Sequence, residues 1–278
     1  MRAILDGDIL RYEIGFAAEK GWQARVGDEA ALPPFDYVRD MLNQRIGYIK
    51  GATRSAYSTI YITEGKTFRE DIATVKPYKG NRPDNKPWHY KNLTVYLRDV
   101  LGARVVTDIE ADDAMAIDHI QSADDTVLCS RDKDLRQVPG EYFSWELGRQ
   151  PEYQAVVHPA GFLDYKPESR KLSGNGYYFF ASQMLTGDVV DNIPGLPGYG
   201  PKKAFEVLRE AFGSGPTSPL EVSSEPMERA ESAVYSEYEK VYGSEADERM
   251  TEQARLCWIT RRLNPDGTPE LWRKGLYV

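Results

Sequence analysis

The chain has 278 residues, of which 41% are hydrophobic, and a formal net charge of -8 at pH 7. This length and apolar content predict a globular protein with one large domain, or with a catalytic domain and a smaller appendage. Two cysteines, Cys129 and Cys257, are too few for a disulfide framework, and no apolar run is long enough for a signal peptide or a membrane span, so we expect a soluble protein of the reducing cytoplasm.

The first part of the chain alternates short β-rich apolar runs with helical patterns, which is typical of a parallel α/β sheet. We expect strands near Ala3–Leu5, Thr59–Ile62, Arg104–Val106, Thr126–Cys129 and Tyr142–Trp145. We expect helices near Ile9–Ala18, Asp36–Ile49, Trp88–Leu101 and Ala111–Ile120, and a loop over Gly21–Pro34. These elements would form an α/β domain over about residues 1–160.

A polar and basic segment runs from Lys66 to Lys91 in this domain. Its composition favours a mobile flap over a site. A solvated loop is the plainer alternative, because basic loops are common and long loops are only sometimes functional. The basic residues are Arg69, Lys76, Lys79, Arg82, Lys86 and Lys91, and they are interleaved with Pro77, Tyr78, Pro83, Pro87 and Trp88.

From about residue 160 the strand signals fade and helical patterns take over, which predicts a helical second domain over residues 161–278. Helices are expected over Gly176–Leu185, Lys202–Phe212 and Arg229–Tyr242. The stretch Gly213–Pro226 is rich in Ser, Pro and Gly and is expected to be a loop.

Acidic residues gather in short clusters, so the net charge does not exclude a polyanionic ligand. Asp6, Glu64, Glu110 and Asp132 each follow a predicted strand. Because the carboxyl ends of parallel strands meet at one edge of a sheet, we expect these carboxylates to converge. Further acidic residues at the starts of the following helices can reach the same crevice, namely Asp8, Asp112, Asp113 and Asp134.

Converging carboxylates repel one another unless cations compensate their charge. Oxygen ligands without His or Cys suit Mg²⁺ or Mn²⁺, and their number allows two ions about 3.5 to 4 Å apart, as in phosphoryl transfer. The alternative for any one cluster is capping of the following helix, and Asp8 and Asp113 fit that role as well.

The segment Gly187–Ala204 has the pattern of a phosphate-binding hairpin. Gly198 and Gly200 allow close backbone approach, Pro201 suits the first helical position, and Lys202 and Lys203 follow. Free amides at this helix start would bind the DNA backbone without reading bases. A plain turn is the alternative. Just upstream, Asp188 and Asp191 are three residues apart and expected on one helical face, which would extend the metal site.

These segments together resemble the phage and bacterial 5′ nuclease family, which includes flap endonucleases, the 5′-nuclease domain of bacterial DNA polymerase I and small phage 5′-3′ exonucleases. The overall size is most similar to a phage exonuclease. The matching pieces, in the order of the family, are Leu5–Asp8, Tyr78–Arg82, Glu110–Asp113, Ser130–Asp134 and Gly187–Ala204.

The resemblance implies a PIN-like α/β nuclease core with a mainly parallel sheet flanked by helices, an arch region at about residues 66–91 and a helix-three-turn-helix element at about residues 187–212. It implies a first metal at Asp6, Glu110, Asp112, Asp113 and Asp132, and a second at Asp134, Asp188 and Asp191. Glu64 stands where the family usually has Asp, so its contact with the metal is either direct or through water.

The resemblance also implies roles in DNA binding. Lys79 and Arg82 would contact the scissile phosphate, and Tyr12 matches a position where the family often stacks a ring on the terminal base, with a core tyrosine as the alternative. The hairpin positions expected to contact DNA are Gly195, Gly198, Gly200, Lys202 and Lys203.

The implied activity is hydrolysis of phosphodiester bonds with two Mg²⁺ or Mn²⁺ ions, Asp6 and Asp132 among the ligands, and 5′-phosphate products. The expected substrate is DNA with 5′ ends, flaps or single-strand/duplex junctions, with RNA primers as a further candidate and K⁺ as a further candidate ion at the helix-three-turn-helix. A monomer without membrane attachment is expected.

Two other functions fit parts of the sequence. A phosphatase of the haloacid-dehalogenase type would use Asp6 and Asp8 as nucleophile and acid, but it leaves the glycine hairpin unexplained. A DNA-binding protein without cleavage activity would need only the hairpin, but it leaves so many convergent negative charges without a purpose.

Overall fold

The computed structural model describes residues 1–212 and 223–277, and these residues form two compact units. Unit 1 comprises Met1–Lys66, Pro83–Lys133 and Glu141–Ala155, and unit 2 comprises Thr67–Arg82, Asp134–Gly140 and Val156–Val278. Among the described residues, no helix is both long enough and apolar enough to cross a membrane.

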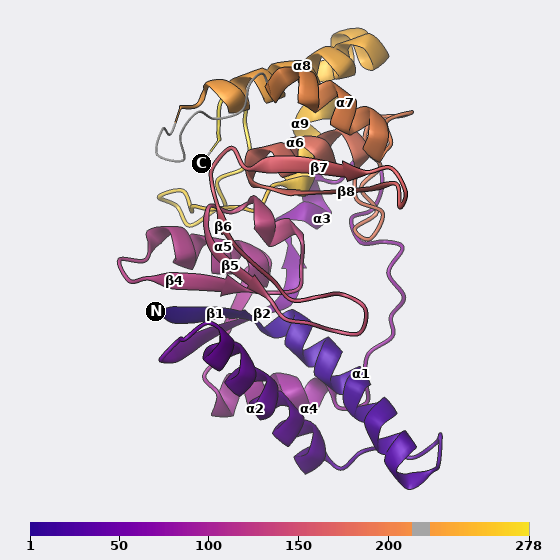
Figure 1. Ribbon diagram of the computed structural model, residues 1–278, viewed down its shortest axis with the longest axis vertical. Coiled ribbons are helices and arrows are strands. Elements are labelled where there is room, and N and C mark those ends of the chain that lie inside the picture. The colour runs from indigo at the N-terminus through magenta and orange to yellow at the C-terminus, as the bar shows by residue number, and fades with distance from the viewer. Residues whose placement is uncertain (213–222, 278) are drawn as a thin grey trace. The chain divides into compact units, whose positions relative to one another are not determined.

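The described residues of the sheet at the centre of unit 1 form six strands in the order β3-β2-β1-β4-β5-β6 (Figure 1). The central strand β1 is flanked by the parallel strands β2 and β4, and β4 pairs in parallel with β5. The strands are β1 (Arg2–Asp6), β2 (Tyr57–Thr67), β3 (Arg104–Asp108), β4 (Thr126–Cys129), β5 (Gly140–Ser144) and β6 (Tyr153–Val157). The predicted parallel sheet is confirmed, and every residue of β1 and β4 is buried.

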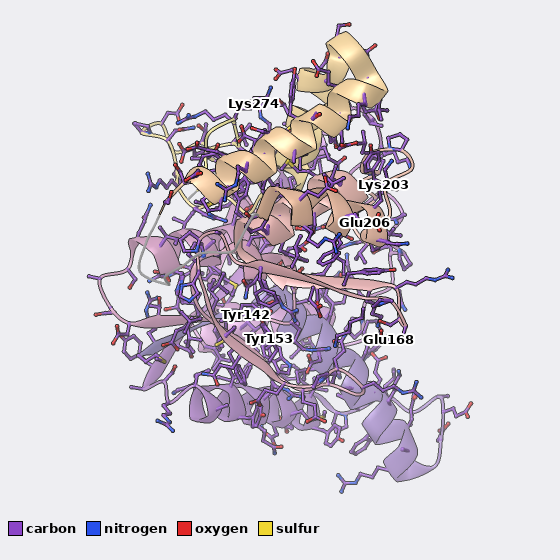
Figure 2. The ribbon with its side chains drawn as sticks, turned by 45° about the horizontal axis from the view of Figure 1, so that its top comes forward. Tyr142, Tyr153, Glu168, Lys203, Glu206 and Lys274 are labelled. Atoms are coloured by element: carbon purple, nitrogen blue, oxygen red, sulfur yellow. The ribbon has the colours of Figure 1, made fainter. Side chains whose placement is uncertain are left out.

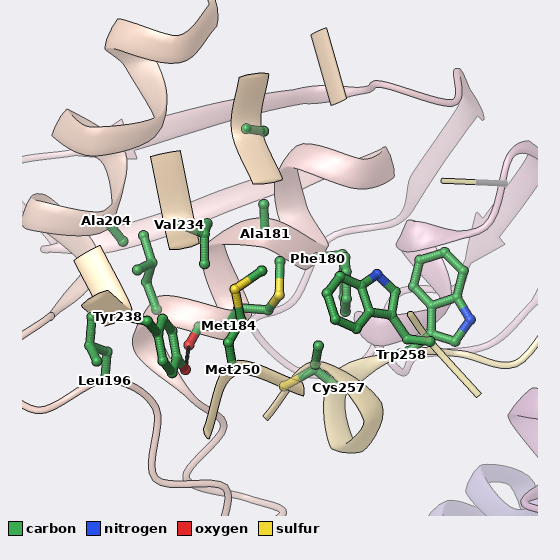
Figure 3. Packing of buried hydrophobic residues seen from close by; sticks show 14 of the residues in the cluster. Phe180, Ala181, Met184, Leu196, Ala204, Val234, Tyr238, Met250, Cys257 and Trp258 are labelled. Carbon is green, nitrogen blue, oxygen red and sulfur yellow. Dashed lines mark hydrogen bonds between the residues drawn. The ribbon is translucent and has the colours of Figure 1, made fainter. Parts of the chain in front are cut away.

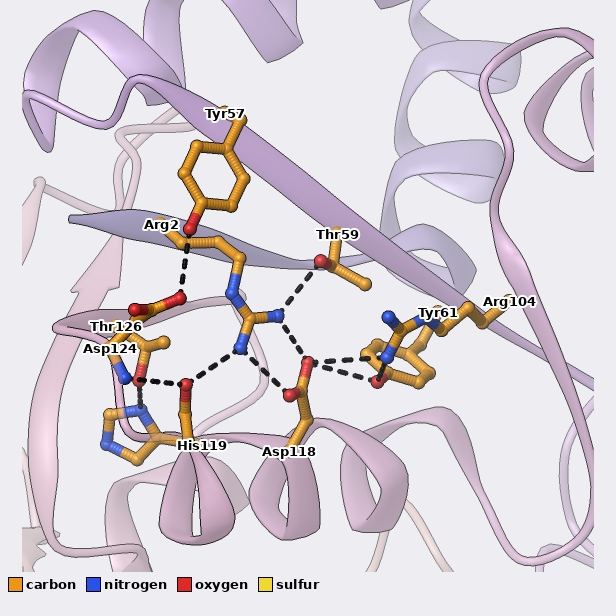
Figure 4. Close-up of polar contacts among 10 residues, drawn as sticks. Arg2, Tyr57, Thr59, Tyr61, Arg104, Asp118, His119, Asp124 and Thr126 are labelled. Carbon is orange, nitrogen blue, oxygen red and sulfur yellow. Dashed lines mark hydrogen bonds and ion pairs between the residues drawn. The ribbon is translucent and has the colours of Figure 1, made fainter.

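Helices cover both faces of this sheet. The apolar core on one face joins Ala3 and Leu5 of β1 to Leu10 and Ile14 of α1 (Gly7–Val26) and to residues of α2 (Phe35–Ala52) and α4 (Tyr90–Val95). The opposite face carries Arg2, which hydrogen-bonds to Asp118 of α5 (Ala111–Gln121) at 2.6 Å (Figure 4).

Two helices of unit 1 differ in extent from the prediction. The loop expected at Gly21–Pro34 begins only at Gly27, because α1 continues to Val26 and ends there, where Gly27 supplies the left-handed conformation (φ 72°) of its C-cap. The helix expected at Trp88–Leu101 starts as α4 at Tyr90 and passes into a π-helical turn, η1 (Tyr96–Val100).

Unit 2 is mainly helical, as predicted. Its helices are α3 (Phe68–Ile72), α6 (Gly176–Thr186), α7 (Pro201–Phe212), α8 (Glu225–Tyr242) and α9 (Ala246–Cys257), with 3-10 turns η2 (Asp134–Gln137) and η3 (Gly243–Glu245). The core forms around α6, which is apolar on all sides and buried from Gly176 to Leu185. Figure 3 shows Met184, Val234 and Met250 packed in this core, where the Tyr238 hydroxyl donates to the Met184 carbonyl (2.6 Å).

Strands in unit 2 were not expected, and this prediction is wrong. Strands β7 (Phe162–Lys166) and β8 (Lys171–Asn175) pair as an antiparallel hairpin. Each strand is only five residues long, and β7 exposes Phe162 on its outward side, so the apolar alternation that marks a strand is weak. The loop expected at Gly213–Pro226 falls largely on residues 213–222, outside the described part of the chain, and α8 already begins at Glu225.

Candidate functional site

The carboxylate of Asp6 lies at the end of the central strand and is 3% exposed. Its Oδ1 accepts from the Ile9 amide (2.9 Å), which caps α1, and its Oδ2 accepts from the Ser130 hydroxyl (2.7 Å). Because β4 pairs with β1 in register Leu5 to Cys129, Ser130 necessarily leaves the sheet beside Asp6. The Ser130 hydroxyl also accepts from the Asp132 amide (2.9 Å), so one side chain links two predicted metal ligands.

Tyr142 of β5 fixes the loop that carries Asp132. Its hydroxyl donates to the carbonyls of Ser130 (2.7 Å) and Asp132 (2.9 Å), and its ring lies near that of Tyr153 in Figure 2, with the centroids 6.0 Å apart. Sequence reasoning missed both Ser130 and Tyr142 as positioning residues. The available signal was the place of Ser130 directly after a buried strand.

Asp8 forms an ion pair with Arg11, which compensates its negative charge. Its Oδ1 accepts from the Thr63 amide of β2 (3.0 Å) and lies 2.7 Å from the guanidinium of Arg11. Arg11 also donates to the Thr63 carbonyl (3.0 Å), and its guanidinium lies 4.5 Å from the centroid of the Tyr90 ring. The structure therefore places Asp8 beside an internal positive charge.

Glu110, Asp112 and Asp113 form the tightest acidic cluster in the described part of the chain, with one carboxylate oxygen of each within 4.8 Å of the others. Glu110 and Asp113 form a capping box at the start of α5, in which the Asp113 carboxylate accepts from the Glu110 amide (3.1 Å). Asp112 accepts from the Asp113 amide (2.7 Å). The alternative role of helix capping is therefore real for Asp113.

The carboxylates of three strand exits influence one another electrostatically. Burial, followed by the charge of Asp8 and with a smaller effect from Asp132, raises the pKa of Asp6 to about 7. Burial also raises the pKa of Asp8, where the charge of Arg11 opposes the shift and that of Glu110 adds to it. Within unit 1, Asp6 and Asp132 therefore share the Ser130 hydroxyl, and the charges of Asp8 and Glu110 act on the same group of carboxylates.

Glu64 does not follow its strand. Strand β2 continues to Thr67, so Glu64 lies within β2 and is half-buried, and this detail of the sequence prediction is wrong. Gly65 has a φ of 84°, so the backbone changes direction directly after Glu64.

Asp188 and Asp191 do not share a helical face, contrary to the prediction. α6 ends at Thr186, and Asp188 pairs with Ile193 through two backbone hydrogen bonds of 2.9 and 2.8 Å that close a turn. The Asp188 carboxylate accepts from the Val190 amide inside this turn (2.8 Å), and Asn192 adopts a positive φ of 60°. Both acidic residues belong to one turn of unit 2.

The segment Tyr78–Arg82 is fastened to this turn. The Arg82 guanidinium forms an ion pair with the Asp191 carboxylate, which also accepts from the Tyr78 hydroxyl (3.2 Å). The Lys79 amide donates to the Asp191 carbonyl (2.9 Å), and the Asn81 side chain donates to the Val189 carbonyl (2.7 Å). Asp191, a predicted metal ligand, and Arg82, a predicted phosphate contact, are therefore paired with each other in this structure.

Asp134 opens the 3-10 turn η2 in unit 2. Its carboxylate accepts from the Gln183 side chain of α6 (2.7 Å), and Gln183 also accepts from Gln137 (2.8 Å). Gln183 is buried and was not singled out from the sequence.

The Gly187–Ala204 segment joins α6 to α7 through a series of turns. Gly187 and Gly195 both have a φ of 68°, and a Cβ on Gly195 would lie 2.4 Å from the Gly187 nitrogen, so their backbones can meet only because both are glycine. Gly198 has a φ of 81°, and both it and Gly200 have open space around them. Lys202 and Lys203 are exposed on the first turn of α7, and Lys203 lies 3.5 Å from the centroid of the Tyr199 ring.

Tyr12 is half-buried on α1, where its ring packs against that of Tyr90 with the centroids 4.9 Å apart. The Tyr90 ring also lies near a second cation besides Arg11, because the Lys86 ammonium is 5.5 Å from its centroid.

The chemistry of unit 1 fits divalent cations. Its donors are carboxylate and hydroxyl oxygens, which Mg²⁺ and Mn²⁺ prefer, and two of the carboxylates carry a pKa raised by burial that a cation would compensate. The fold and this cluster define an α/β protein with an acidic site at the carboxyl edge of a mainly parallel sheet.

Comparison with known proteins finds one similar solved fold and several relatives of partly similar sequence. The crystal structure of the bacteriophage T5 flap endonuclease with DNA and metal ions has a TM-score of 0.50 and 17% identity, and the match covers 92% of this chain and 98% of that chain. DNA polymerase I of Pseudomonas aeruginosa is 27% identical over 187 residues, which make up 65% of this chain and 19% of the polymerase. Flap endonuclease Xni of Shewanella baltica is 31% identical over 147 residues, 50% of this chain and 51% of Xni.

The chain is similar in sequence to parts of 5′ nucleases and flap endonucleases, and its α/β fold is the 5′ nuclease fold. It matches about half the length of Xni and about a fifth of the polymerase. No protein-family model matches the chain.

Proposed function

We propose that this protein is a metal-dependent 5′ nuclease that hydrolyses phosphodiester bonds of DNA, as a 5′-3′ exonuclease with flap endonuclease activity, and leaves 5′-phosphates. The proposal is supported by the acidic residues at the strand exits of unit 1, where the Ser130 hydroxyl links Asp6 to Asp132 and where carboxylate oxygens of Glu110, Asp112 and Asp113 lie within 4.8 Å of one another. Apart from Asp8, which is paired with Arg11, like charges gathered in this way are costly unless they hold cations.

In this proposal two divalent cations, Mg²⁺ or Mn²⁺, supply a nucleophilic hydroxide and charge neutralisation when bound. The residues of unit 1 that would hold one ion are Asp6, Glu64, Glu110, Asp112, Asp113 and Asp132. Asp134, Asp188 and Asp191 of unit 2 would serve the second. Ser130 keeps Asp6 and Asp132 in place through its two hydrogen bonds.

Lys79 and Arg82 would bind the scissile phosphate. Because Arg82 is paired with Asp191 in this structure, it must exchange that carboxylate for the phosphate of the substrate. A cation at Asp191 would favour the exchange, since the carboxylate then no longer needs Arg82. Binding of metal and of DNA would therefore support each other at this turn.

The DNA backbone would lie against the turns between α6 and α7, with Gly195, Gly198 and Gly200 giving room for phosphates and Lys202 and Lys203 giving charge. Tyr12 would stack on a terminal base. DNA with 5′ ends, flaps or junctions is the proposed substrate, with RNA primers as a further one and K⁺ as a further ion at these turns. Two relatives support this choice: Xni is a flap endonuclease, and the T5 enzyme was crystallised with DNA and metal ions.

The protein would act as a monomer in the cytoplasm, the compartment favoured by its two free and buried cysteines, Cys129 and Cys257.

The decisive test is Asp132→Asn, assayed with Mg²⁺ on a duplex with a 5′ overhang. Removing one ligand charge should lower the cleavage rate by about 100-fold or more. The control is Asp124→Asn, an exposed aspartate outside the cluster, which should cleave at the wild-type rate. Wild-type cleavage by Asp132→Asn at saturating Mg²⁺ would contradict the proposal.

The same preparation separates the competing functions. A DNA-binding protein without cleavage activity would bind the duplex in Ca²⁺ and leave it intact in Mg²⁺. A small-molecule phosphatase would hydrolyse p-nitrophenyl phosphate and ignore DNA.

A further inference from the structure

A cavity of about 680 Å³ lies between the β7–β8 hairpin and α7, within unit 2. Tyr165 and Arg170 line it from the hairpin, and Lys202, Phe205 and Arg209 line it from α7. None of these residues except Lys202 has a place in the proposed nuclease site. The volume is large enough for a nucleotide-sized group.

The cavity is positive in a chain that is negative overall. Three of its side chains are cations, Arg170, Lys202 and Arg209, and one is a carboxylate, Glu206, which lies 3.8 Å from the Lys202 ammonium. Arg170 and Arg209 are exposed, and neither has an ion pair or a side-chain hydrogen bond within the described part of the chain. Two cations at one opening are therefore available to an anionic ligand.

Two aromatic rings line the same cavity. The rings of Tyr165 and Phe205 lie with their centroids 6.0 Å apart and their planes inclined by 29°, and both side chains are half-buried. Cations beside partly exposed ring faces suit a nucleotide, because the phosphate binds the cations and the base stacks on a ring.

Basic residues gather at the turn end of the β7–β8 hairpin, and strand pairing does not account for them. Lys166 and Lys171 lie directly opposite each other in the last pair of the ladder, where like charges destabilise a hairpin. Arg170, next to Lys171, is held at a φ of 54°, which is unfavourable for a residue with a Cβ. Figure 2 shows Glu168 at this turn and Glu206 on α7, and Glu168 does not line the cavity. A polyanion at this end would relieve the repulsion.

We propose that this cavity, which we call the hairpin site, binds a single strand of DNA. Arg170 and Arg209 contact phosphodiester oxygens, and an unpaired base stacks against Tyr165 and Phe205. An unpaired base is required because bases inside a duplex already have both faces stacked. The proposal rests on the proposed function in that its ligand is the single-stranded part of the nuclease substrate.

The charge arm of the test measures binding in Ca²⁺ by fluorescence anisotropy with two probes, a duplex with a 5′ single-stranded overhang and a blunt duplex of the same base-paired length. The variant is Arg170→Gln with Arg209→Gln. Arg54→Gln is the matched control, because Arg54 is also exposed and has a φ of 52°.

The double variant should bind the overhang probe about tenfold more weakly, with a dependence of log K on log salt that is smaller by about 1.4. The blunt duplex should bind as it does to the wild type, and Arg54→Gln should not change either probe. Equal weakening with both probes would show a duplex contact and overturn the single-strand proposal. Unchanged binding of the overhang probe would overturn the hairpin site altogether.

The stacking arm uses 2-aminopurine in the overhang, whose fluorescence falls when it stacks. Tyr165→Leu and Phe205→Leu should each reduce this quenching and weaken overhang binding by about tenfold, while circular dichroism confirms the native fold. Quenching equal to the wild type in both variants would overturn the aromatic contact.

Cleavage in Mg²⁺ keeps the two proposals apart. If the wild type binds the overhang through Arg170 and Arg209 but cuts no DNA, the proposed function fails and the hairpin site stands. If it cuts DNA and the double variant binds and cuts like the wild type, the hairpin site fails alone.

Discussion

Ser130 shows how one uncharged side chain can organise an acidic site. It is fully buried, donates to Asp6 and accepts from the Asp132 amide. Ser130→Ala removes both bonds but no charge, so it should lower stability by only about 1 kcal/mol and cleavage by about tenfold.

A merely structural role for Ser130 would affect stability alone. The apparent Mg²⁺ concentration for half-maximal cleavage should therefore rise in Ser130→Ala and recover in Ser130→Thr. Ser182→Ala is the matched control, because it removes a buried hydroxyl that donates to the Phe179 carbonyl in α6. Equal Mg²⁺ dependence in Ser130→Ala and Ser182→Ala would contradict the positioning role.

Asp118 is a second residue whose contacts lead to a prediction, here for the stability of the protein rather than for its activity. Arg2 holds its carboxylate with two hydrogen bonds of 2.6 and 2.9 Å, and the Tyr61 hydroxyl adds a third of 3.0 Å (Figure 4). Burial raises the pKa of Asp118, but the bonds from Arg2 and Tyr61 outweigh it, so the net pKa lies below 3.8. The ionised form is therefore stabilised in the folded state.

Because the folded-state pKa is lowered, the contribution of Asp118 is complete above about pH 4 and is lost as the pH falls through the folded-state value. Asp118→Asn should destabilise the protein by about 2 kcal/mol at pH 6, measured by urea unfolding, and the difference from the wild type should shrink below pH 4. Asp124→Asn, which loses one exposed bond from Tyr57, should change stability by less than about 0.5 kcal/mol. A difference for Asp118→Asn that is constant from pH 6 to pH 3 would refute this account.

At the scale of elements, α3 is fixed to the end of α9 by one arginine. Arg69 is 1% exposed and donates to the carbonyls of Leu256 (3.3 Å) and Trp258 (2.6 Å), which the end of α9 leaves without helical partners. The sequence places Arg69 in a basic flap, but the structure gives it a core role. Arg69→Met should therefore lower stability by about 3 kcal/mol in urea unfolding, because buried carbonyls lose their donor.

Lys76→Met is the control for this prediction, since Lys76 is an exposed cation of the same segment. It should unfold at the wild-type urea concentration. If both variants unfold alike, Arg69 does not hold α9.

Secondary-structure elements could be predicted where the burial of successive side chains produces a continuous apolar run in the sequence. β1 and β4 are short and buried throughout, and their bounds were found within a residue. The hairpin β7–β8 was missed because its order depends on packing against α7, through Tyr165 and Phe205, rather than on an apolar run of its own. The turn at Asp188 was missed because the hydrogen bonds that close it join Asp188 to Ile193 across a reversal of the chain. The spacing of the two acidic residues in the sequence does not indicate such a reversal.

At the scale of the whole molecule, the sequence predicts an acidic site from topology. Because the exits of parallel strands lie at one edge of a sheet, Asp6, Glu110 and Asp132 are expected to lie close together, and for Asp6 and Asp132 the shared Ser130 hydroxyl supports this. Pairings between distant segments were not, and Arg82 with Asp191 is the clearest case, because the two residues are 109 positions apart. No local pattern reports such a contact.

The same acidic site should couple the stability of the whole protein to divalent cations. Without a cation, Glu110, Asp112 and Asp113 repel one another across less than 4.8 Å. A ligand that binds only the folded state stabilises it by about 3 kcal/mol at 100 times its dissociation constant, so saturating Mg²⁺ should raise the melting temperature by about 5 °C or more. Sodium chloride of equal ionic strength should give a much smaller rise, because a site that selects divalent ions is not merely screened.

Asp112→Asn separates binding from screening in the same calorimetric experiment. It removes a repelling charge without removing the capping pair of Glu110 and Asp113, so the metal-free variant should melt at or above the wild-type temperature, while its Mg²⁺-induced shift should fall by at least half. Asp36→Asn is the matched control, because Asp36 is likewise an acidic residue in the first turn of a helix, α2, but exposed. A full Mg²⁺ shift in Asp112→Asn would mean that the cation does not bind this cluster.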